Sequence, residues 1–266
     1  MTGRAPMRYD MHMWQNRERA LSFGSDAARY DRARPSYPAE LIDDLMAGHP
    51  WHVLDIGCGT GKAGRLLVNR GCQVLGVEPD DRMAAVARTY GLDVDVAPFE
   101  QWDAAGRYFD LAICAQAWHW IEPVAGLRRV AGVLQPNARF AIFWNHASYD
   151  DEVLADLDRI YARIAPQIAD RAVIVGNVPN ARLEDDVKAM TSSSQFTPPD
   201  DRRYTRSLEY PADDFLELLR THSDHMLLPD ATLATLLDEV KALIATHGGA
   251  LTVEYRTRLL LLTRRA

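Results

Sequence analysis

Hydrophobic residues follow two different spacings between residues 53 and 144. Short apolar runs, which are typical of buried strands, occupy residues 53–56, 73–77, 94–97, 110–114 and 139–144. Between these runs, apolar residues recur every three or four positions, which predicts helices over residues 65–70, 81–90 and 123–134. Strands that alternate with helices imply right-handed crossover connections, so this part of the chain predicts a parallel sheet.

The chain on both sides of this region follows other patterns. Ser25 and Asp26 favour a helix start, and they predict a short helix that ends near Arg34. Pro38 opens a second helix, because proline suits the first helical turn. After residue 145 the alternation stops, and the apolar positions within 153–168 predict one long amphipathic helix.

The remaining C-terminal part combines loop, strand and helix signals. Residues 191–201 are rich in Ser, Pro and Asp and predict a loop. Beyond them, the spacing predicts a strand over 203–210, helices over 212–221 and 231–246, and a final strand over 252–263.

The order of these elements predicts an α/β fold. We expect a Rossmann-like, doubly wound, mostly parallel seven-stranded sheet with an α-helical cap insertion. Four regions follow from this interpretation: an N-terminal helical segment (1–50), a Rossmann-like core (51–145), a helical cap over the binding edge of the sheet (146–200), and strands and helices that complete the sheet (201–266).

Composition and charge exclude several classes of protein. The 266 residues are 47% hydrophobic and carry a formal net charge of −7, which argues against a duplex nucleic-acid partner, since such binders usually carry a basic face. Three cysteines without a CxxC pair indicate neither a disulfide framework nor a zinc site. Apolar runs such as 259–262 are far too short to span a bilayer, and the N-terminal start is polar. We therefore expect a cytoplasmic protein, monomer or homodimer, with no membrane span and no metal.

A glycine-rich segment follows the first predicted strand and opens a helix. Residues 55–61 are Asp-Ile-Gly-Cys-Gly-Thr-Gly. Glycines at such a place let the backbone turn sharply and approach a ligand closely. In an open parallel sheet, ligands bind beyond the carboxyl ends of the strands, beside the first strand.

Three ligand classes compete for this segment. A phosphate-binding loop needs four residues between its first glycine and Gly-Lys, but only three separate Gly57 from Gly61. A dinucleotide fingerprint is present over 59–64, yet Asp55 would repel a pyrophosphate. Asp55 suits the ammonium or sulfonium of S-adenosylmethionine. Glu78 stands 21 residues after Gly57 and suits ribose hydroxyls, which both remaining ligands carry.

Several segments resemble a known family. DIGCGTG (55–61), GVEP (76–79) and LQP (134–136) resemble class I S-adenosylmethionine-dependent methyltransferases. FGSD (23–26), YDRARPSYP (30–38) and AQAWHW (115–120) resemble the small-molecule branch that includes trans-aconitate-type methyltransferases. This family often has Gly-Gly before the fifth strand, where this chain has Asn137-Ala138; Asn tolerates the left-handed turn.

The resemblance implies a role for each part of the cofactor site. Residues 57–61 would wrap the methionine and ribose, and Glu78 would hold the ribose hydroxyls. Residues 99–100 would flank the adenine, and residues 115–116 would lie near the amino-acid end. Residues 30 and 34 would close over the carboxylate of the cofactor. Together with Asp55, the predicted cofactor-binding residues are Tyr30, Arg34, Asp55, Gly57, Cys58, Gly59, Thr60, Gly61, Glu78, Pro79, Phe99, Glu100, Ala115 and Gln116.

Aromatic residues at the ends of two strands are candidates for the substrate side. Trp118 and His119 follow the fourth strand, and Trp144 ends the fifth. They suggest a substrate wall with His119 as general base or hydrogen-bond donor, because histidine is the commonest base near neutral pH. In the alternative, a tryptophan packs in the core and His119 bonds to backbone.

These observations predict a methyltransferase that uses S-adenosylmethionine and releases S-adenosylhomocysteine. The expected reaction is in-line methyl transfer to an O atom (carboxylate or hydroxyl) or an N atom of a small molecule. A quinone- or lipid-like phenol as the acceptor remains an alternative. So does a non-catalytic or NAD-binding Rossmann protein.

Overall fold

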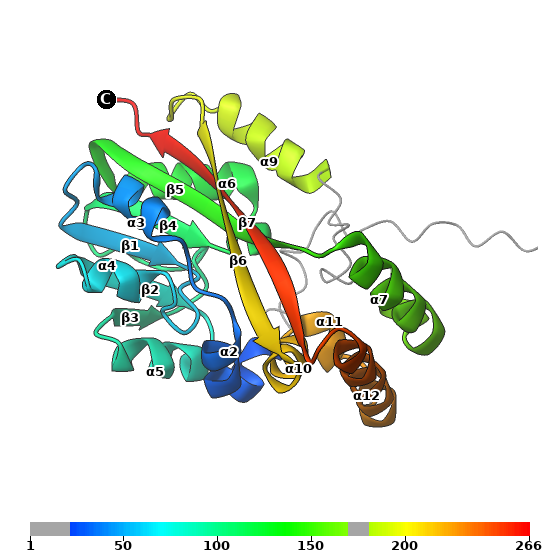
Figure 1. Ribbon diagram of the computed structural model, residues 1–266. Coiled ribbons are helices and arrows are strands. Elements are labelled where there is room, and N and C mark those ends of the chain that lie inside the picture. Colours follow the sequence, from blue (N-terminus) through cyan, green and yellow to red (C-terminus); the bar gives the residue numbers. More distant parts are fainter. Residues whose placement is uncertain (1–21, 170–180) are drawn as a thin grey trace, which may run out of the picture.

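A computed structural model describes residues 22–169 and 181–266 (Figure 1). Seven strands form one sheet in the order β3-β2-β1-β4-β5-β7-β6. Their bounds are β1 His52–Ile56, β2 Gln73–Glu78, β3 Asp93–Val96, β4 Phe109–Ala115, β5 Leu134–Ser148, β6 Asp200–Pro211 and β7 Ala250–Thr263. Strands β1 to β5 pair in parallel, whereas β7 runs antiparallel to both β5 and β6. The predicted mostly parallel, seven-stranded α/β fold is confirmed.

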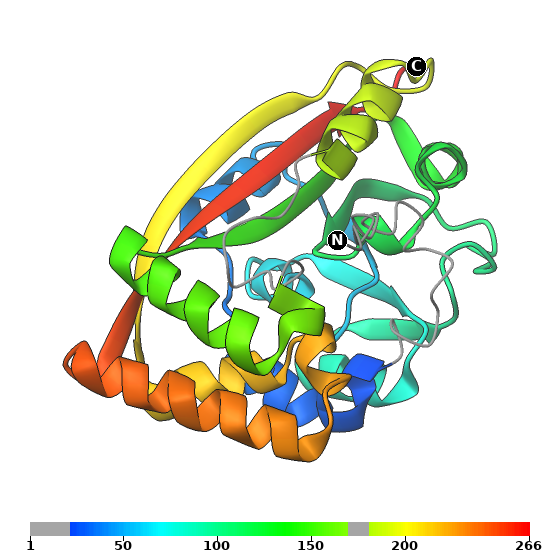
Figure 2. The same ribbon diagram turned by 90° about the vertical axis from the view of Figure 1, so that its right-hand side faces the viewer.

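Helices cover both faces of the sheet and one end of it (Figures 1 and 2). Their bounds are η2 Ser22–Asp26, α2 Ala27–Ala33, α3 Ala39–Met46, α4 Gly64–Val68, α5 Asp81–Thr89, η3 Trp118–Trp120, α6 Pro123–Val133, α7 Asp151–Ile164, α8 Pro166–Ala169, α9 Ala181–Thr191, α10 Ala212–Arg220, α11 Ser223–Met226 and α12 Asp230–Thr246. Asp26 caps α2 by accepting a hydrogen bond from the Arg29 N–H, as the sequence predicts for a helix start there.

The apolar core consists of three clusters. One lies on the sheet face under α3, α4 and α5, and a second on the opposite face under α6 and α9. The third joins α7, α8, α10 and α12 to the far ends of β6 and β7, and we call it the cap cluster. Figure 2 shows these helices as a layer at one end of the long strands.

Helices of the predicted cap range 146–200 belong to two different clusters. α7 and α8 pack in the cap cluster with helices from the region 201–266, whereas Met190 of α9 packs in the cluster under α6. Residues 1–21 of the predicted N-terminal segment and residues 170–180 of the predicted cap lie outside the described residues.

Several predicted elements differ from the structure. The single helix predicted over 153–168 is wrong: α7 ends at Ile164 and α8 begins at Pro166, because proline lacks an N–H and clashes with the preceding turn. The loop predicted over 191–201 ends two residues early, since β6 begins at Asp200. Helices α9 and α11 were not predicted, as α11 is only four residues long and α9 carries few apolar residues.

No helix within residues 22–169 and 181–266 is long and apolar enough to cross a membrane.

Candidate functional site

The glycine loop, residues 57–61, connects β1 to α4 at the carboxyl edge of the sheet. Gly57, Gly59 and Gly61 all have positive φ angles, of 64°, 55° and 76°. The loop is closed by backbone hydrogen bonds from Gly57 N to Val77 O (2.8 Å) and from Gly61 N to Cys58 O (2.8 Å). Only glycine adopts such angles without strain, so the sequence pattern reflects a real backbone requirement.

The glycines of this loop differ in the space around them. A Cβ atom at Gly57 would lie 2.6 Å from the Cβ of Ala117, and one at Gly61 would lie 3.1 Å from the Cβ of Ala87. A Cβ at Gly59 would meet only the Met83 Cε, at an ordinary 3.5 Å. Gly57 and Gly61 are therefore required by packing, whereas Gly59 leaves space that a ligand can occupy.

Glu78 ends β2 beside the glycine loop. Its Oε2 accepts a hydrogen bond from Gly59 N (2.9 Å), and its Oε1 accepts one from Asp80 N (3.0 Å). Burial nevertheless raises the pKa of Glu78 to about 7, because desolvation outweighs these two hydrogen bonds. Each carboxylate oxygen retains a further lone pair, so Glu78 can still accept hydrogen bonds from a ligand.

Asp55 is fully buried at the end of β1. Its Oδ2 accepts a hydrogen bond from Gly64 N (3.0 Å) at the start of α4, a contact that the sequence did not predict. Its Oδ1 is buried and has no hydrogen-bond partner in the described part of the chain. Burial, aided by the Glu78 charge, raises the pKa of Asp55 to about 7. A buried unpaired oxygen of this kind is unfavourable without a partner.

Helix α2 is bound to the glycine loop through Asp31, which is only 8% exposed. Asp31 accepts hydrogen bonds from Thr60 Oγ1 (2.9 Å), Arg65 Nη1 (3.0 Å) and Tyr90 OH (2.7 Å). Burial raises the pKa of Asp31, but the bonds from Tyr90 and Thr60 and the Arg65 charge outweigh it and lower the pKa. Sequence reasoning missed Asp31, because its partners lie far away along the chain.

Tyr30 and Arg34, the predicted carboxylate clamp, lie in the middle and at the C-terminal end of α2. The Arg34 guanidinium carbon lies 5.2 Å from the centre of the Tyr30 ring. Arg34 Nη2 donates a hydrogen bond to the Thr221 carbonyl (2.9 Å) at the end of α10, and its Nε is buried without a partner in the residues described. Arg34 therefore joins α2 to helix α10 of the cap cluster.

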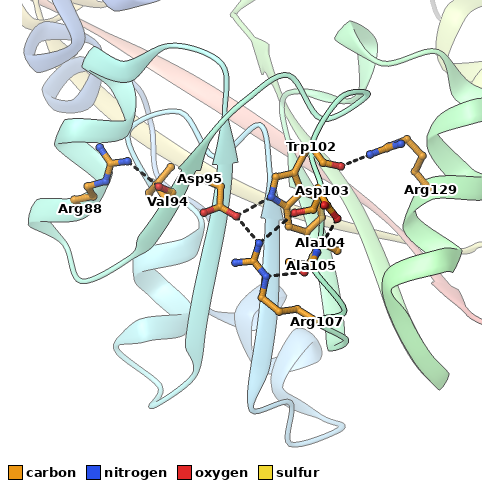
Figure 3. A network of polar contacts seen from close by, with 9 residues as sticks. All are labelled: Arg88, Val94, Asp95, Trp102, Asp103, Ala104, Ala105, Arg107 and Arg129. Atoms are coloured by element: carbon orange, nitrogen blue, oxygen red, sulfur yellow. Dashed lines mark hydrogen bonds and ion pairs between the residues drawn. The ribbon is translucent and has the colours of Figure 1, made fainter.

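The segment after β3 is held in place by the polar network of Figure 3. Asp95 accepts hydrogen bonds from Arg107 Nη2 (2.6 Å) and Trp102 Nε1 (2.8 Å), and Arg129 Nε donates to the Phe99 carbonyl (3.0 Å). The Phe99 ring is buried and stacks on Trp102 at 6.2 Å, whereas Glu100 is partly exposed. Asp95 of β3 and Arg129 of α6 thus fix this segment, which lies beside Glu78 because Ala97 N donates to the Glu78 carbonyl.

Gln116 has an unusual backbone conformation just after β4 and the partly exposed Ala115. Its φ is 59°, although it is not a glycine. Its backbone N donates to the Phe143 carbonyl (3.0 Å), and its side-chain Nε2 donates to the Asn145 carbonyl (3.3 Å). Strained residues of this kind concentrate at functional sites. Asn137 has the left-handed φ (63°) expected from the sequence.

The structure separates the aromatic residues proposed for the substrate side. Trp118 is fully buried, its ring lies 5.2 Å from that of Phe140, and its Nε1 has no hydrogen-bond partner among the described residues. Trp144 is 7% exposed and belongs to the same cluster. Both are core residues, so the structure supports the packing alternative for them. His119 remains partly exposed, with its ring 4.9 Å from the Trp120 ring.

Comparison with known proteins identifies the family. Residues 54–142 match the model of the methyltransferase domain family. An uncharacterized methyltransferase of Mycobacterium bovis is 30% identical over 236 residues, which cover 87% of this chain and 88% of that protein. The chain belongs to the class I S-adenosylmethionine-dependent methyltransferases.

Solved structures agree with this membership. A candidate type II methyltransferase from Anaeromyxobacter dehalogenans is 27% identical, with a TM-score of 0.61 over 86% of this chain and 97% of that one. The plantazolicin methyltransferase BpumL, solved with S-adenosylhomocysteine, shares 11% identity and a TM-score of 0.52 over 96% and 97% of the two chains. The second likeness concerns the fold alone.

The site of this methyltransferase fits S-adenosylmethionine. The glycine loop leaves room at Gly59, Glu78 has lone pairs for hydroxyl groups, and the unpaired Asp55 oxygen suits a positively charged ligand. The NAD alternative is thereby set aside. Within residues 22–169 and 181–266, no group of three or more His, Cys, Asp and Glu side chains could hold a metal ion.

The two glycines at 57 and 59 give a matched pair of variants. Gly59→Ala should fold, with a penalty of about 1–2 kcal/mol for its left-handed backbone, and should bind S-adenosylmethionine more weakly. Gly57→Ala should lower the melting temperature further, because its Cβ would also clash with Ala117. Thermal melts and calorimetric titration check both. Unchanged cofactor affinity in Gly59→Ala would mean that the loop does not contact the ligand.

Asp55→Asn should stabilise the cofactor-free methyltransferase at pH 8. The folded state binds the Asp55 proton more tightly than the unfolded state does, since burial raises its pKa from 3.8 to about 7. Stability from this group is therefore lost as pH rises from about 4 to 7. The variant should gain up to about 4 kcal/mol at pH 8 and much less at pH 4. Denaturant titrations of both proteins, with the exposed Asp93→Asn as control, check this; equal gains at both pH values would contradict it.

Proposed function

We propose that this methyltransferase acts on a small molecule and transfers the methyl group in line to an O or N acceptor. The observation that carries the proposal is the junction of the glycine loop and Glu78, which presents paired hydrogen-bond acceptors beside an open Gly59. The cofactor supplies a methyl group that its sulfonium already activates. The protein must therefore bind the cofactor and the acceptor, orient them for the transfer, and exclude water.

Each part of the site has a proposed role in holding the cofactor. Glu78 accepts hydrogen bonds from the ribose hydroxyls, next to Pro79. The unpaired Asp55 oxygen and residues 57–61 face the positively charged methionine portion. The other proposed contacts are Tyr30 and Arg34 with the carboxylate, Ala115 and Gln116 with the amino-acid end, and Phe99 (through its backbone) and Glu100 with the adenine.

A small acceptor is supported by the way in which the N-terminal helix and the cap are joined. Arg29 of α2 donates to Glu217 of α10 (2.8 Å), and Arg34 donates to the carbonyl of Thr221. This connection holds the cap helices against the helix that contacts the glycine loop. Such a cover limits the size of the acceptor and keeps water from the transfer. The net charge of −7 favours neither DNA nor RNA as the substrate.

His119 is the proposed proton acceptor. It is partly exposed, and it follows β4, whose carboxyl end lies at the ligand edge of the sheet. A hydroxyl or amine acceptor loses a proton on methylation, and His119 would take it. A carboxylate acceptor needs no base, so His119 would then only position the substrate.

Glu78→Gln should weaken S-adenosylmethionine binding by about 1.5–3 kcal/mol, because a charged acceptor of hydrogen bonds is lost. In the unchanged enzyme, affinity should fall as pH drops below about 7, where Glu78 becomes protonated. Calorimetry from pH 5.5 to 8.5 on both proteins would reveal both effects. An unchanged dissociation constant in Glu78→Gln would show that other residues bind the ribose.

His119→Ala should reduce kcat about 10²–10⁴-fold if the acceptor is a phenol, alcohol or amine, with nearly normal cofactor affinity. With a carboxylate acceptor, the change should appear mainly in KM. Transfer of labelled methyl groups to a panel of carboxylic acids, phenols and amines identifies the acceptor. His52→Ala is the control, because His52 begins β1 at the end opposite to the glycine loop. Full activity of His119→Ala would exclude a catalytic role.

A further inference from the structure

We propose that Arg206 and Lys62, which lie beside Arg34, form an anion subsite that binds a carboxylate or phosphate group of the methyl-accepting substrate. This group anchors the substrate and differs from the atom that receives the methyl group. The inference rests on the proposed function, because the subsite adjoins the cofactor site.

The two arginines converge on one short segment from different elements. Arg206, on β6, donates a hydrogen bond to the carbonyl of Ser36, two positions after Arg34. Its guanidinium carbon lies 5.9 Å from the centre of the Tyr255 ring. The Nε atoms of Arg206 and Arg34 are both buried, and neither has a hydrogen-bond partner in the described part of the chain. Two buried N–H donors, one on each arginine, are therefore available to a ligand.

Lys62 adds a third cation, directly after the glycine loop. Its ammonium makes no hydrogen bond or ion pair with any residue of 22–169 and 181–266, although the side chain is half-buried. Burial, together with the nearby charges of Arg65, Arg206 and Arg34, lowers the pKa of Lys62 to about 8. These charges act on Lys62 because the cations lie close to one another.

No carboxylate forms an ion pair with any of these three cations among the residues described. Asp31 is the acid that acts on Lys62, but Thr60, Arg65 and Tyr90 already bind its oxygens. Arg34, Lys62 and Arg206 take part in no ion pair in the same residues, whereas Arg65 pairs with Asp31 at 3.0 Å. Because half-buried cations without a compensating acid are unfavourable, an anionic ligand would stabilise them.

The cofactor alone does not supply enough negative charge. S-adenosylmethionine carries a sulfonium and an ammonium against a single carboxylate, so its binding increases the positive charge of the site. Its carboxylate is already assigned to Tyr30 and Arg34. The donors of Arg206 and Lys62 then remain for an acid on the second substrate, which the guanidinium fork and the ammonium both recognise.

Arg206→Gln and Lys62→Gln test the subsite, with Arg203→Gln as the matched control. Arg203 lies three positions earlier on β6, so its side chain is on the opposite face, and it is 73% exposed. Labelled methyl transfer is measured with carboxylic acids, their neutral amides and phosphate monoesters. Calorimetry with succinate and with inorganic phosphate, on enzyme loaded with S-adenosylhomocysteine, distinguishes carboxylate from phosphate.

The expected result is a KM for the acidic acceptor that rises about 10–100-fold in Arg206→Gln and Lys62→Gln, with kcat and cofactor affinity within about twofold. Arg206→Lys should recover part of the loss, and Arg203→Gln should behave like the unchanged enzyme. Amides accepted as well as acids, or loaded enzyme that binds neither succinate nor phosphate, would overturn the subsite. So would a loss of cofactor affinity alone, which would assign the cations to the cofactor.

A failure of the proposed function would look different. An enzyme that binds no S-adenosylmethionine, or that transfers its methyl group only to a macromolecule, refutes the small-molecule assignment whatever Arg206→Gln does. An enzyme that methylates neutral phenols or amines and ignores acids keeps the proposed function and refutes only the anion subsite.

Discussion

The hydrogen bonds to the buried carboxylate of Asp31 connect the parts of this methyltransferase that must act together. Thr60 and Arg65 bring the glycine loop and the start of α4 to this carboxylate. Helix α2, which carries Asp31, also contacts helix α10 of the cap cluster through Arg29 and Glu217. A buried ion pair adds little net stability, because both charges lose water. Its effect here is orientation: the glycine loop, α2 and the cap helices are held in one arrangement.

The site also contains several charged groups that are largely buried. Asp55 and Glu78 are held in a poorly solvated environment that raises the pKa of each to about 7. Cations at positions 34, 62 and 206 lack carboxylate partners in the described residues. Groups of both signs are thus less well compensated than in an ordinary core. Such an arrangement is unfavourable in the free protein and becomes favourable when a ligand of matching charges binds, which is typical of functional sites.

The sequence predicted those features that depend on neighbouring residues. The positive φ angles of Gly57, Gly59 and Gly61, the Asp26 cap and the left-handed Asn137 are local backbone properties, and all were present. The positions of the tryptophan side chains were harder to predict, because tryptophan occurs both in cores and in the walls of substrate sites. Trp118 is in the core because Phe140, distant in sequence, provides its packing surface.

The sequence by itself therefore determined the fold class, the cofactor and the strand ends at which the cofactor site is built. Periodicity and glycine positions are sufficient for this, since backbone geometry imposes them. Only the tertiary structure decided which side chains meet: Asp31 with Arg65, Arg34 with the end of α10, and Arg206 with Ser36. These partners lie 34, 187 and 170 positions apart. No local pattern encodes such contacts. Asp31 meets Arg65 only when α2 packs beside α4, and the contacts of Arg34 and Arg206 form only when β6 and the helix α10 that follows it fold back onto the sheet.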